Sequence, residues 1–174
     1  LDIALPGLSG IDVCREIRGS RIATGVVMVT SRASELDVIL GFDVGADDYV
    51  VKPCRPREIC ARIRALARRV RPDGATAVRR EVLERGPLRI DLAARRVATE
   101  DGAEIALTAT EYALLLELAG SPDVARSRSE LLARVFDSQH EGYARNVDCH
   151  VTRVRRKLEQ AGLAAPLIHT VHGV

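Results

Sequence analysis

The 174-residue sequence predicts an α/β unit with a parallel sheet over residues 1–70, followed by an α+β winged helix-turn-helix over residues 86–174. In the first unit, short apolar runs alternate with helical patterns, the order expected of a parallel sheet covered by helices. In the second, short strand patterns precede three helices, the last of them basic. Residues 71–85 carry charge, proline and glycine without a long periodic pattern, and we predict a linker there.

The first unit contains two predicted strands. Residues 26–29 (VVMV) form an apolar run that suits a strand buried on both faces, and residues 49–51 form a second. Pro56 stands near the start of the last helix, where proline is tolerated. The predicted helices span residues 10–18, 34–44 and 57–70.

The second unit begins with strand patterns and turns. Thr108 followed by Glu111 forms a capping box, which opens a helix through Leu118. Two further helices are predicted at 129–135 and 145–161, and a last strand begins at 168–171. The strand patterns before the helices are residues 88–90, 96–98 and 104–107, with a turn at 100–102.

The helix that begins at Arg145 has two faces. Its apolar stripe is Val147, Val151, Val154 and Leu158. A helix that buries one face and offers arginines on another suits the DNA major groove. An ordinary solvated basic helix has the same pattern. The polar side is formed by Arg145, Cys149, Thr152, Arg153 and Arg156.

The composition is that of a globular protein, with 47% hydrophobic and 29% charged residues. The net charge is only +2, so nucleic-acid binding must rest on the local basic cluster. The four cysteines show no paired spacing and indicate reduced thiols in a cytoplasmic protein. No apolar run is long enough to span a membrane.

The order of these blocks resembles the OmpR/PhoB family of two-component response regulators. The resemblance implies a flavodoxin-like receiver, whose N-terminal part is missing from this chain, and a winged-helix effector. We therefore expect this sequence to be a piece of a longer protein. The receiver-like blocks are 1–18, 26–32, 45–53 and 57–69, and the effector-like blocks are 107–115, 127–136, 145–159 and 169–174.

In the receiver, the resemblance makes Asp2 the phosphoacceptor. A carboxylate at the end of a parallel strand also lies where such sheets bind ligands. Thr30 and Lys52 fall on positions that contact the phosphoryl group, Tyr49 falls on the switch aromatic, and the Lys52–Pro53 bond is expected to be cis. The carbonyl of Ala4 would join Asp2 in binding Mg²⁺, with further acidic ligands expected upstream of Leu1.

In the effector, the resemblance implies contacts with double-stranded promoter DNA. Asp148 is a poor DNA contact, and we expect it to pair within the protein. The loop from Phe136 to Ala144 falls where the family contacts RNA polymerase. The predicted DNA-binding residues are Arg145, Asn146, His150, Arg153, Arg155 and, at the wing tip, His172.

The expected protein is a phosphorylation-controlled transcription regulator, not an enzyme. A sensor histidine kinase would phosphorylate it, and it would then form a homodimer. Asp47, Glu58 and Arg62 fall on charged positions of the dimer surface. Val38 and Leu40 stand where basic residues are common, so one expected ion pair of Glu58 cannot form.

Two other readings remain open. The chain could be a DNA-binding regulator with a degenerate receiver that acts without phosphorylation, because Ala4, Val38, Leu40 and Cys54 depart from common residues. It could also be a small phosphotransfer enzyme or relay whose helix is merely basic. The first reading predicts DNA binding without phosphorylation, and the second predicts no DNA affinity.

Overall fold

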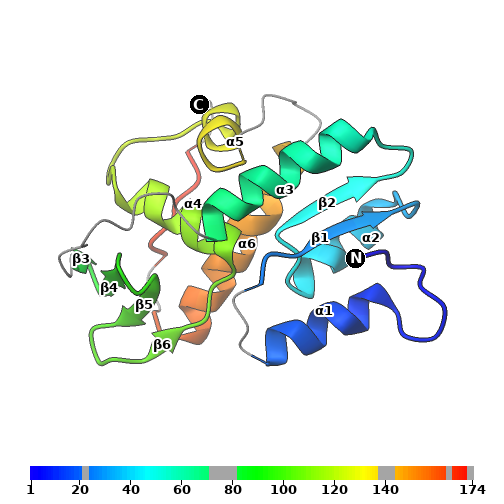
Figure 1. Ribbon diagram of the computed structural model, residues 1–174. Helices are drawn as coiled ribbons and strands as arrows, with labels where there is room; N and C mark the ends of the chain where they lie inside the picture. Colours follow the sequence, from blue (N-terminus) through cyan, green and yellow to red (C-terminus); the bar gives the residue numbers. More distant parts are fainter. Residues whose placement is uncertain (21–23, 71–81, 137–143, 164–165, 172–174) are drawn as a thin grey trace.

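The computed structural model describes residues 1–20, 24–70, 82–136, 144–163 and 166–171 (Figure 1). In the first unit β1 and β2 pair in parallel, with Val27 opposite Asp48 and Thr30 opposite Val51, which confirms the predicted parallel pair. Ser9 and Ser34 cap α1 and α2 through their hydroxyl groups. The elements are α1 (Gly10–Gly19), β1 (Val27–Thr30), α2 (Glu35–Asp43), β2 (Asp48–Val51) and α3 (Pro56–Val70).

The second unit is a four-stranded antiparallel sheet, in the order β3-β4-β5-β6, packed against three helices. The capping box of Thr108 and Glu111 is confirmed at the start of α4. The elements are β3 (Val82–Arg85), β4 (Leu88–Asp91), β5 (Arg96–Thr99), β6 (Glu104–Ile105), α4 (Ala109–Ala119), α5 (Arg128–Phe136) and α6 (Ala144–Gln160).

Two expectations for the second unit were wrong. Strand β3 lies inside the predicted linker, because residues 82–85 pair along their whole length with β4. The predicted strand at 168–171 does not form. Arg155 of α6 instead binds this segment, donating to the carbonyl of Ile168 at 2.9 Å and to the hydroxyl of Thr170 at 2.8 Å.

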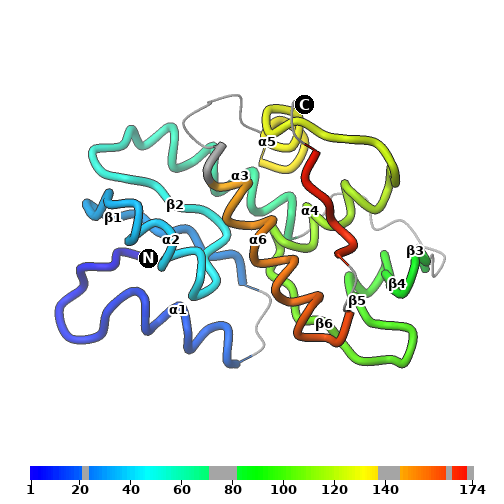
Figure 2. The backbone as a smooth tube through the Cα atoms, turned by 180° about the vertical axis from the view of Figure 1, so that it is seen from behind, coloured from blue at the N-terminus to red at the C-terminus, as the bar shows by residue number. Residues whose placement is uncertain are grey.

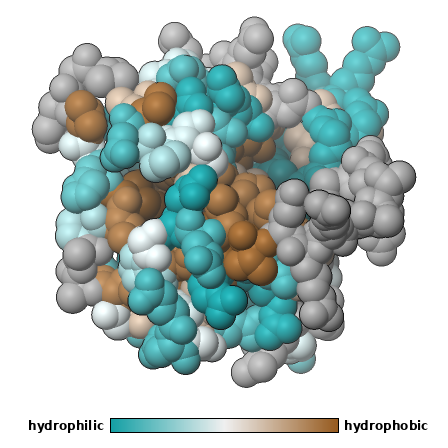
Figure 3. All heavy atoms as spheres, turned by 90° about the vertical axis from the view of Figure 1, so that its left-hand side faces the viewer, coloured by the Kyte–Doolittle hydropathy of each residue, from teal (hydrophilic) through white to brown (hydrophobic). Residues whose placement is uncertain are grey.

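The two units pack against each other. Helix α3 contacts α4 and α5, and α6 lies alongside α2 at the seam, as Figure 2 shows from behind. Cys149 of α6 packs against the core cluster of the first unit, which includes Met28, Phe42 and Tyr49. The view onto the second unit shows hydrophobic patches separated by hydrophilic side chains (Figure 3). None of the described helices is long and apolar enough to cross a membrane.

Candidate phosphoacceptor site and candidate DNA-binding helix

Asp2 lies at the carboxyl end of the parallel strands. The chain start runs beside β1: the amino group of Leu1 donates to the carbonyl of Val27 at 2.8 Å, and the N–H of Val29 donates to the carbonyl of Leu1 at 2.7 Å. Gly10 allows α1 to begin against this segment, because a Cβ there would meet the carbonyl oxygen of Asp2 at 2.0 Å. The carboxylate therefore stands where open parallel sheets bind ligands.

Lys52 and Asp2 form an ion pair. Lys52 Nζ donates to Asp2 Oδ2 at 2.6 Å, and the N–H of Ala4 donates to Oδ1 at 3.1 Å. These two hydrogen bonds, that of Lys52 first, lower the pKa of Asp2 to about 2. The carboxylate is thus ionised at neutral pH, with a cation beside it to offset added negative charge. The Lys52–Pro53 peptide bond is cis, as expected.

Thr30 and Tyr49 are joined through the backbone of Arg32. The hydroxyl of Thr30, at the end of β1, accepts from the N–H of Arg32 at 3.3 Å. The hydroxyl of Tyr49, on β2, donates to the carbonyl of Arg32 at 2.8 Å. Both side chains are buried, and burial raises the pKa of Tyr49. A shift of Thr30 toward Asp2 would therefore also displace the side chain of Tyr49.

The described residues do not build a complete magnesium site. Mg²⁺ prefers six oxygen ligands in octahedral geometry. Asp2 and the carbonyl of Ala4 offer two, and no group of three or more potential ligand side chains occurs among the described residues.

Helix α6 buries its apolar stripe as predicted. Val147, Val154 and Leu158 are 1%, 0% and 3% exposed. Asp148 pairs with Arg128 of α5 at 2.8 Å, which confirms the expected partner within the protein. The local pattern therefore fixes both the helix and the side that faces the second core.

In the described arrangement, the side chains of α6 that are expected to face DNA are covered. Asn146, His150 and Arg153 are 5%, 0% and 6% exposed. Asn146 Nδ2 donates to Asp48 Oδ1 at 3.3 Å, and the ring of His150 packs edge-on against Phe42 at 4.9 Å between centroids. The first unit covers two of these predicted contacts, so this surface cannot reach DNA while the units remain packed.

Asp47 is the polar centre of the contact between the units. Its carboxylate accepts from Arg18 Nη2 at 2.8 Å, from the N–H of Val26 at 3.0 Å and from the N–H of Thr110 at 3.0 Å. Thr110 lies in the first turn of α4, where the helix dipole favours a negative charge. The carbonyl of Asp47 accepts from His150 Nε2 at 3.2 Å. Strand β2 is thus bonded to both α4 and α6 at its start.

Arg153 is engaged within the second unit. Its Nε donates to Glu111 Oε1 at 2.8 Å, and Lys157 Nζ donates to Oε2 at 2.5 Å. Burial opposes ionisation of Glu111, but Lys157 and Arg153 outweigh it and lower its pKa to about 2. The family resemblance implies that Arg153 faces DNA, and helical spacing alone does not show that Glu111 of α4 lies opposite it.

The other predicted contacts are placed differently. Arg155 holds the segment of Ile168 and Thr170, as described above. The side chain of Arg145, His172 and most of the predicted polymerase loop lie outside the described residues. Asp43, near the end of α2, forms an additional ion pair with Arg156 at 3.3 Å.

The predicted dimer residues separate into two environments. Glu58 and Arg62 lie on α3, with Arg62 Nε 3.3 Å from the Glu58 carboxylate and Arg62 Nη1 2.7 Å from that of Asp48. Asp47 is fully buried between the units. Glu58 and Arg62 thus line one surface, whereas Asp47 is unavailable to a second copy in this arrangement.

Comparisons with known proteins identify both units. The "Response regulator receiver domain" model matches residues 1–64, and the "Transcriptional regulatory protein, C terminal" model matches 102–174. The transcriptional regulatory protein ResD of Bacillus subtilis is 43% identical over 178 residues, which cover 100% of this chain and 73% of ResD. The chain belongs to the OmpR/PhoB family of response regulators.

Other relatives of this OmpR/PhoB regulator agree. The DNA-binding response regulator MtrA of Mycolicibacterium smegmatis is 41% identical over 174 residues, covering 100% of this chain and 73% of MtrA. A RitR mutant structure superposes with a TM-score of 0.68 at 24% identity, covering 99% of this chain and 74% of that chain. The latter supports the two-unit fold alone. The family consists of two-component transcription regulators with a DNA-binding domain.

Sequence reasoning missed three residues that organise this OmpR/PhoB chain: Phe42, Thr110 and Glu111. Phe42 looks like any core residue of a helix, and Thr110 like any first-turn residue. Glu111 was assigned only to the capping box, although it also binds two cations of α6. A second stripe on α6 offered a signal, because Asn146, His150, Arg153 and Lys157 share the spacing of the apolar stripe. Because the side chains of this second stripe are polar, the pattern alone does not indicate that the stripe is buried.

Proposed function

We propose that the chain is a phosphorylation-controlled DNA-binding regulator whose closed arrangement covers its own recognition helix. The closed arrangement is the packing of α6 and the start of α4 against Phe42, Asp43, Asp47 and Asp48. The observation that carries the proposal is the position of β2. This strand begins at Asp48, which binds α6, and ends directly before Lys52, which binds Asp2.

Phosphorylation would act at the Lys52 end of this strand. An oxygen of Asp2 attacks the phosphorus atom of the donor, an O–P bond forms, and the bond to the donor's leaving group breaks with its electron pair. The new group carries about −1.5 to −2 charges. It attracts Lys52 and the hydroxyl of Thr30. Because Tyr49 lies between Lys52 and Asp48 on β2, the displacement reaches the contacts of the closed arrangement.

The closed arrangement has identifiable weaknesses. His150 Nδ1 and Arg153 Nη1 are buried without a hydrogen-bond partner among the described residues. Each such group costs about 1–3 kcal/mol. The Asp43–Arg156 pair is about half exposed on both sides and contributes only about 0–1 kcal/mol. A switch from 1:99 to 99:1 needs about 5.5 kcal/mol. Weak contacts of this kind make such a switch accessible.

The opened helix would present Asn146 and His150 to double-stranded promoter DNA, with Arg145 beside them and His172 at the wing. We further propose that a sensor histidine kinase is the phosphodonor, that Mg²⁺ assists with Asp2 and the Ala4 carbonyl among its ligands, and that the protein works in the cytoplasm. Contact with RNA polymerase belongs to the same proposal.

The proposed dimer would use the α2–β2–α3 surface. Its apolar side chains include Ile39, Leu40, Val51 and Ile63, which are between 38% and 52% exposed. Glu58 and Arg62 border them. Large exposed apolar groups that share one surface are typical of a protein–protein contact.

The first experiment measures phosphorylation. The intact mass of the full-length protein is recorded after incubation with a small phosphodonor and Mg²⁺, beside Asp2→Ala. A gain of one phosphoryl group that disappears in the variant supports the proposal. No gain, together with unchanged DNA binding, would instead favour the degenerate receiver.

The second experiment tests the closed arrangement. Asp43→Arg places like charges together at Arg156 and should open the arrangement by about 1 kcal/mol, or roughly fivefold in DNA affinity without phosphorylation. Glu16→Arg on α1 is the matched control, because it makes the same change of charge at an exposed site away from α6.

DNA affinity is measured by fluorescence anisotropy over a salt series. Phosphate contacts give a log–log slope of about −0.9 per phosphate neutralised. Equal affinities for both variants would show that α6 is not covered. A flat salt dependence would contradict DNA binding itself and leave a phosphotransfer relay.

A further inference from the structure

A cleft of about 470 Å³ runs along the seam between the two units. Its walls come from α3 of the first unit, from α4 and α5 of the second, and from the turn before β5. It is separate from the Asp2 site and from the contacts of α6 with α2. A molecule held there would touch both units at once.

The polar lining of this arginine cleft is strongly cationic. Arg68, Arg69, Arg95 and Arg134 line it, with Glu117 as the one carboxylate among its described lining residues. Glu117 is already engaged, at 3.2 Å from Arg134 and 3.7 Å from Arg126. The described lining residues therefore carry an excess of positive charge.

Arg69 has no carboxylate in contact within the described part of the chain. The residue is only 7% exposed, and its guanidinium donates to the carbonyl of Ala65 at 3.3 Å and to the hydroxyl of Thr110. The ring of Phe136 lies 5.2 Å from it. Burial lowers the pKa of Arg69, while Asp48 and Asp47 oppose this from a greater distance. The positive charge is thus buried among neutral partners, at a cost in free energy.

Arg95 is held in the cleft by an unusual backbone. Its φ is +53°, in the left-handed region that non-glycine residues seldom adopt. In this conformation its guanidinium stacks 4.4 Å from the centre of the Tyr112 ring and donates to the carbonyl of Arg69 at 2.5 Å. That bond satisfies a carbonyl near the end of α3. Partial burial lowers the pKa of Arg95 also.

We propose that the arginine cleft binds a small phosphate-bearing molecule and thereby bridges the two units. Guanidinium groups present forked donors that match phosphate oxygens. The volume lies within the usual range of small-molecule sites. Alanine, leucine and valine side chains in the walls, with the Tyr112 ring, suit a ligand that has an apolar or aromatic part beside its phosphates. A bound anion would supply the opposite charge that Arg69 and Arg95 lack.

The test uses the full chain and two probes, inorganic pyrophosphate and adenosine triphosphate, in calorimetric titrations without Mg²⁺. The expected result is saturable binding of at least one probe. Arg134→Gln should weaken that binding about tenfold, because it removes a charged donor from the wall. Arg68→Gln should act in the same direction.

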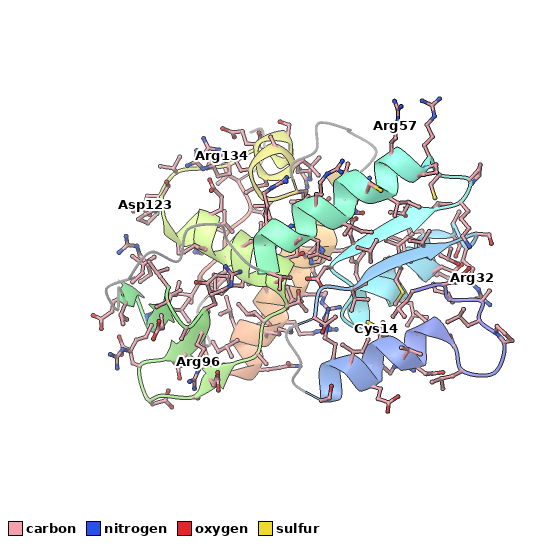
Figure 4. The ribbon with its side chains drawn as sticks, in the orientation of Figure 1. Cys14, Arg32, Arg57, Arg96, Asp123 and Arg134 are labelled. Carbon is pink, nitrogen blue, oxygen red and sulfur yellow. The ribbon has the colours of Figure 1, made fainter. Side chains whose placement is uncertain are left out.

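Arg96→Gln is the matched control. Arg96 is exposed on β5, pairs with Glu104 at 2.9 Å and does not line the cleft; Figure 4 shows it far from Arg134. The Arg96→Gln variant should bind both probes with the affinity of the unchanged chain. No saturable binding at millimolar concentrations, or equal loss in all three variants, would overturn the proposal. Weaker binding of duplex DNA in Arg134→Gln without probe binding would overturn it too, and assign this arginine to DNA.

A second readout separates this inference from the proposed function. If the closed arrangement covers α6, a ligand that bridges the units must lower the affinity of the chain for DNA. By thermodynamic linkage, bound DNA must then lower the affinity of the chain for that ligand by the same factor. Binding of the probe to the cleft does not depend on that link. Probe binding without an effect on DNA would leave the site standing and contradict the closed arrangement.

Discussion

His150 provides a direct test of whether the recognition helix is covered. Its ring is fully buried between Phe42 and Phe136, and Nε2 donates to the carbonyl of Asp47. Burial lowers its pKa from 6.5 to about 4, with Glu111 and Asp47 opposing the shift and Arg153 and Arg69 reinforcing it. An uncovered histidine on a helix surface would titrate near 6.5.

The size of this effect follows from the shift. One pKa unit corresponds to about 1.4 kcal/mol, so a fall from 6.5 to about 4 amounts to about 3 kcal/mol. The open arrangement binds the proton more tightly. Acid therefore favours opening, beginning as pH falls through 6.5 and reaching its full extent below about 4, whereas above pH 7 the histidine contributes nothing. At pH 5 the closed arrangement should lose about 2 kcal/mol.

The assay is an NMR titration of the histidine ring protons between pH 7.5 and 5. His150→Gln identifies the signal by its absence. The pKa of Glu111 is about 2, so its ion pairs persist between pH 7.5 and 5 and do not contribute to the titration of His150. We expect no midpoint for His150 above pH 5 in the unchanged chain, and a shift toward 6.5 in Asp43→Arg. An ordinary midpoint in the unchanged chain would refute the covered helix.

Three further predictions concern stability, each measured by urea unfolding. Glu111→Gln should lower the free energy of unfolding by about 3 kcal/mol, because it leaves the buried Arg153 without its carboxylate. The control, Glu104→Gln at an exposed site, should leave the free energy of unfolding nearly unchanged. Thr108→Ala removes the capping box and should cost about 1 kcal/mol. Arg128→Ala should change stability by less than about 1 kcal/mol, because its ion pair is more than half exposed on both sides, and a larger loss would contradict that reading.

Local signals in the sequence predicted the elements well. The Thr108–Glu111 box opens α4, and the apolar run at 26–29 became a strand beside 48–51. Such signals work because they depend on neighbours within a few residues. Asp2 and Lys52 also lie together as expected, because the strand ends of a parallel sheet meet at one edge.

Contacts between the units were beyond the same reasoning. Helical spacing gives the angle of Arg153 around α6 but not what stands opposite, and Glu111 lies more than one helix away in sequence. The buried state of His150 depends on Phe42 and Asp47, which belong to the other unit. Strand β3 was not predicted for a related reason, because its four residues form a strand only through pairing with β4.

The packing of the units joins the two proposed activities of the chain. Asp47 falls on the proposed dimer surface, yet the N–H of Thr110 and the ring of His150 occupy it here. A second copy that pairs through Asp47 must first displace α4 and α6. Pairing of receivers and exposure of the recognition helix then draw on the same opening step. Each would favour the other without any direct contact between the dimer surface and DNA, because both bind only the open arrangement.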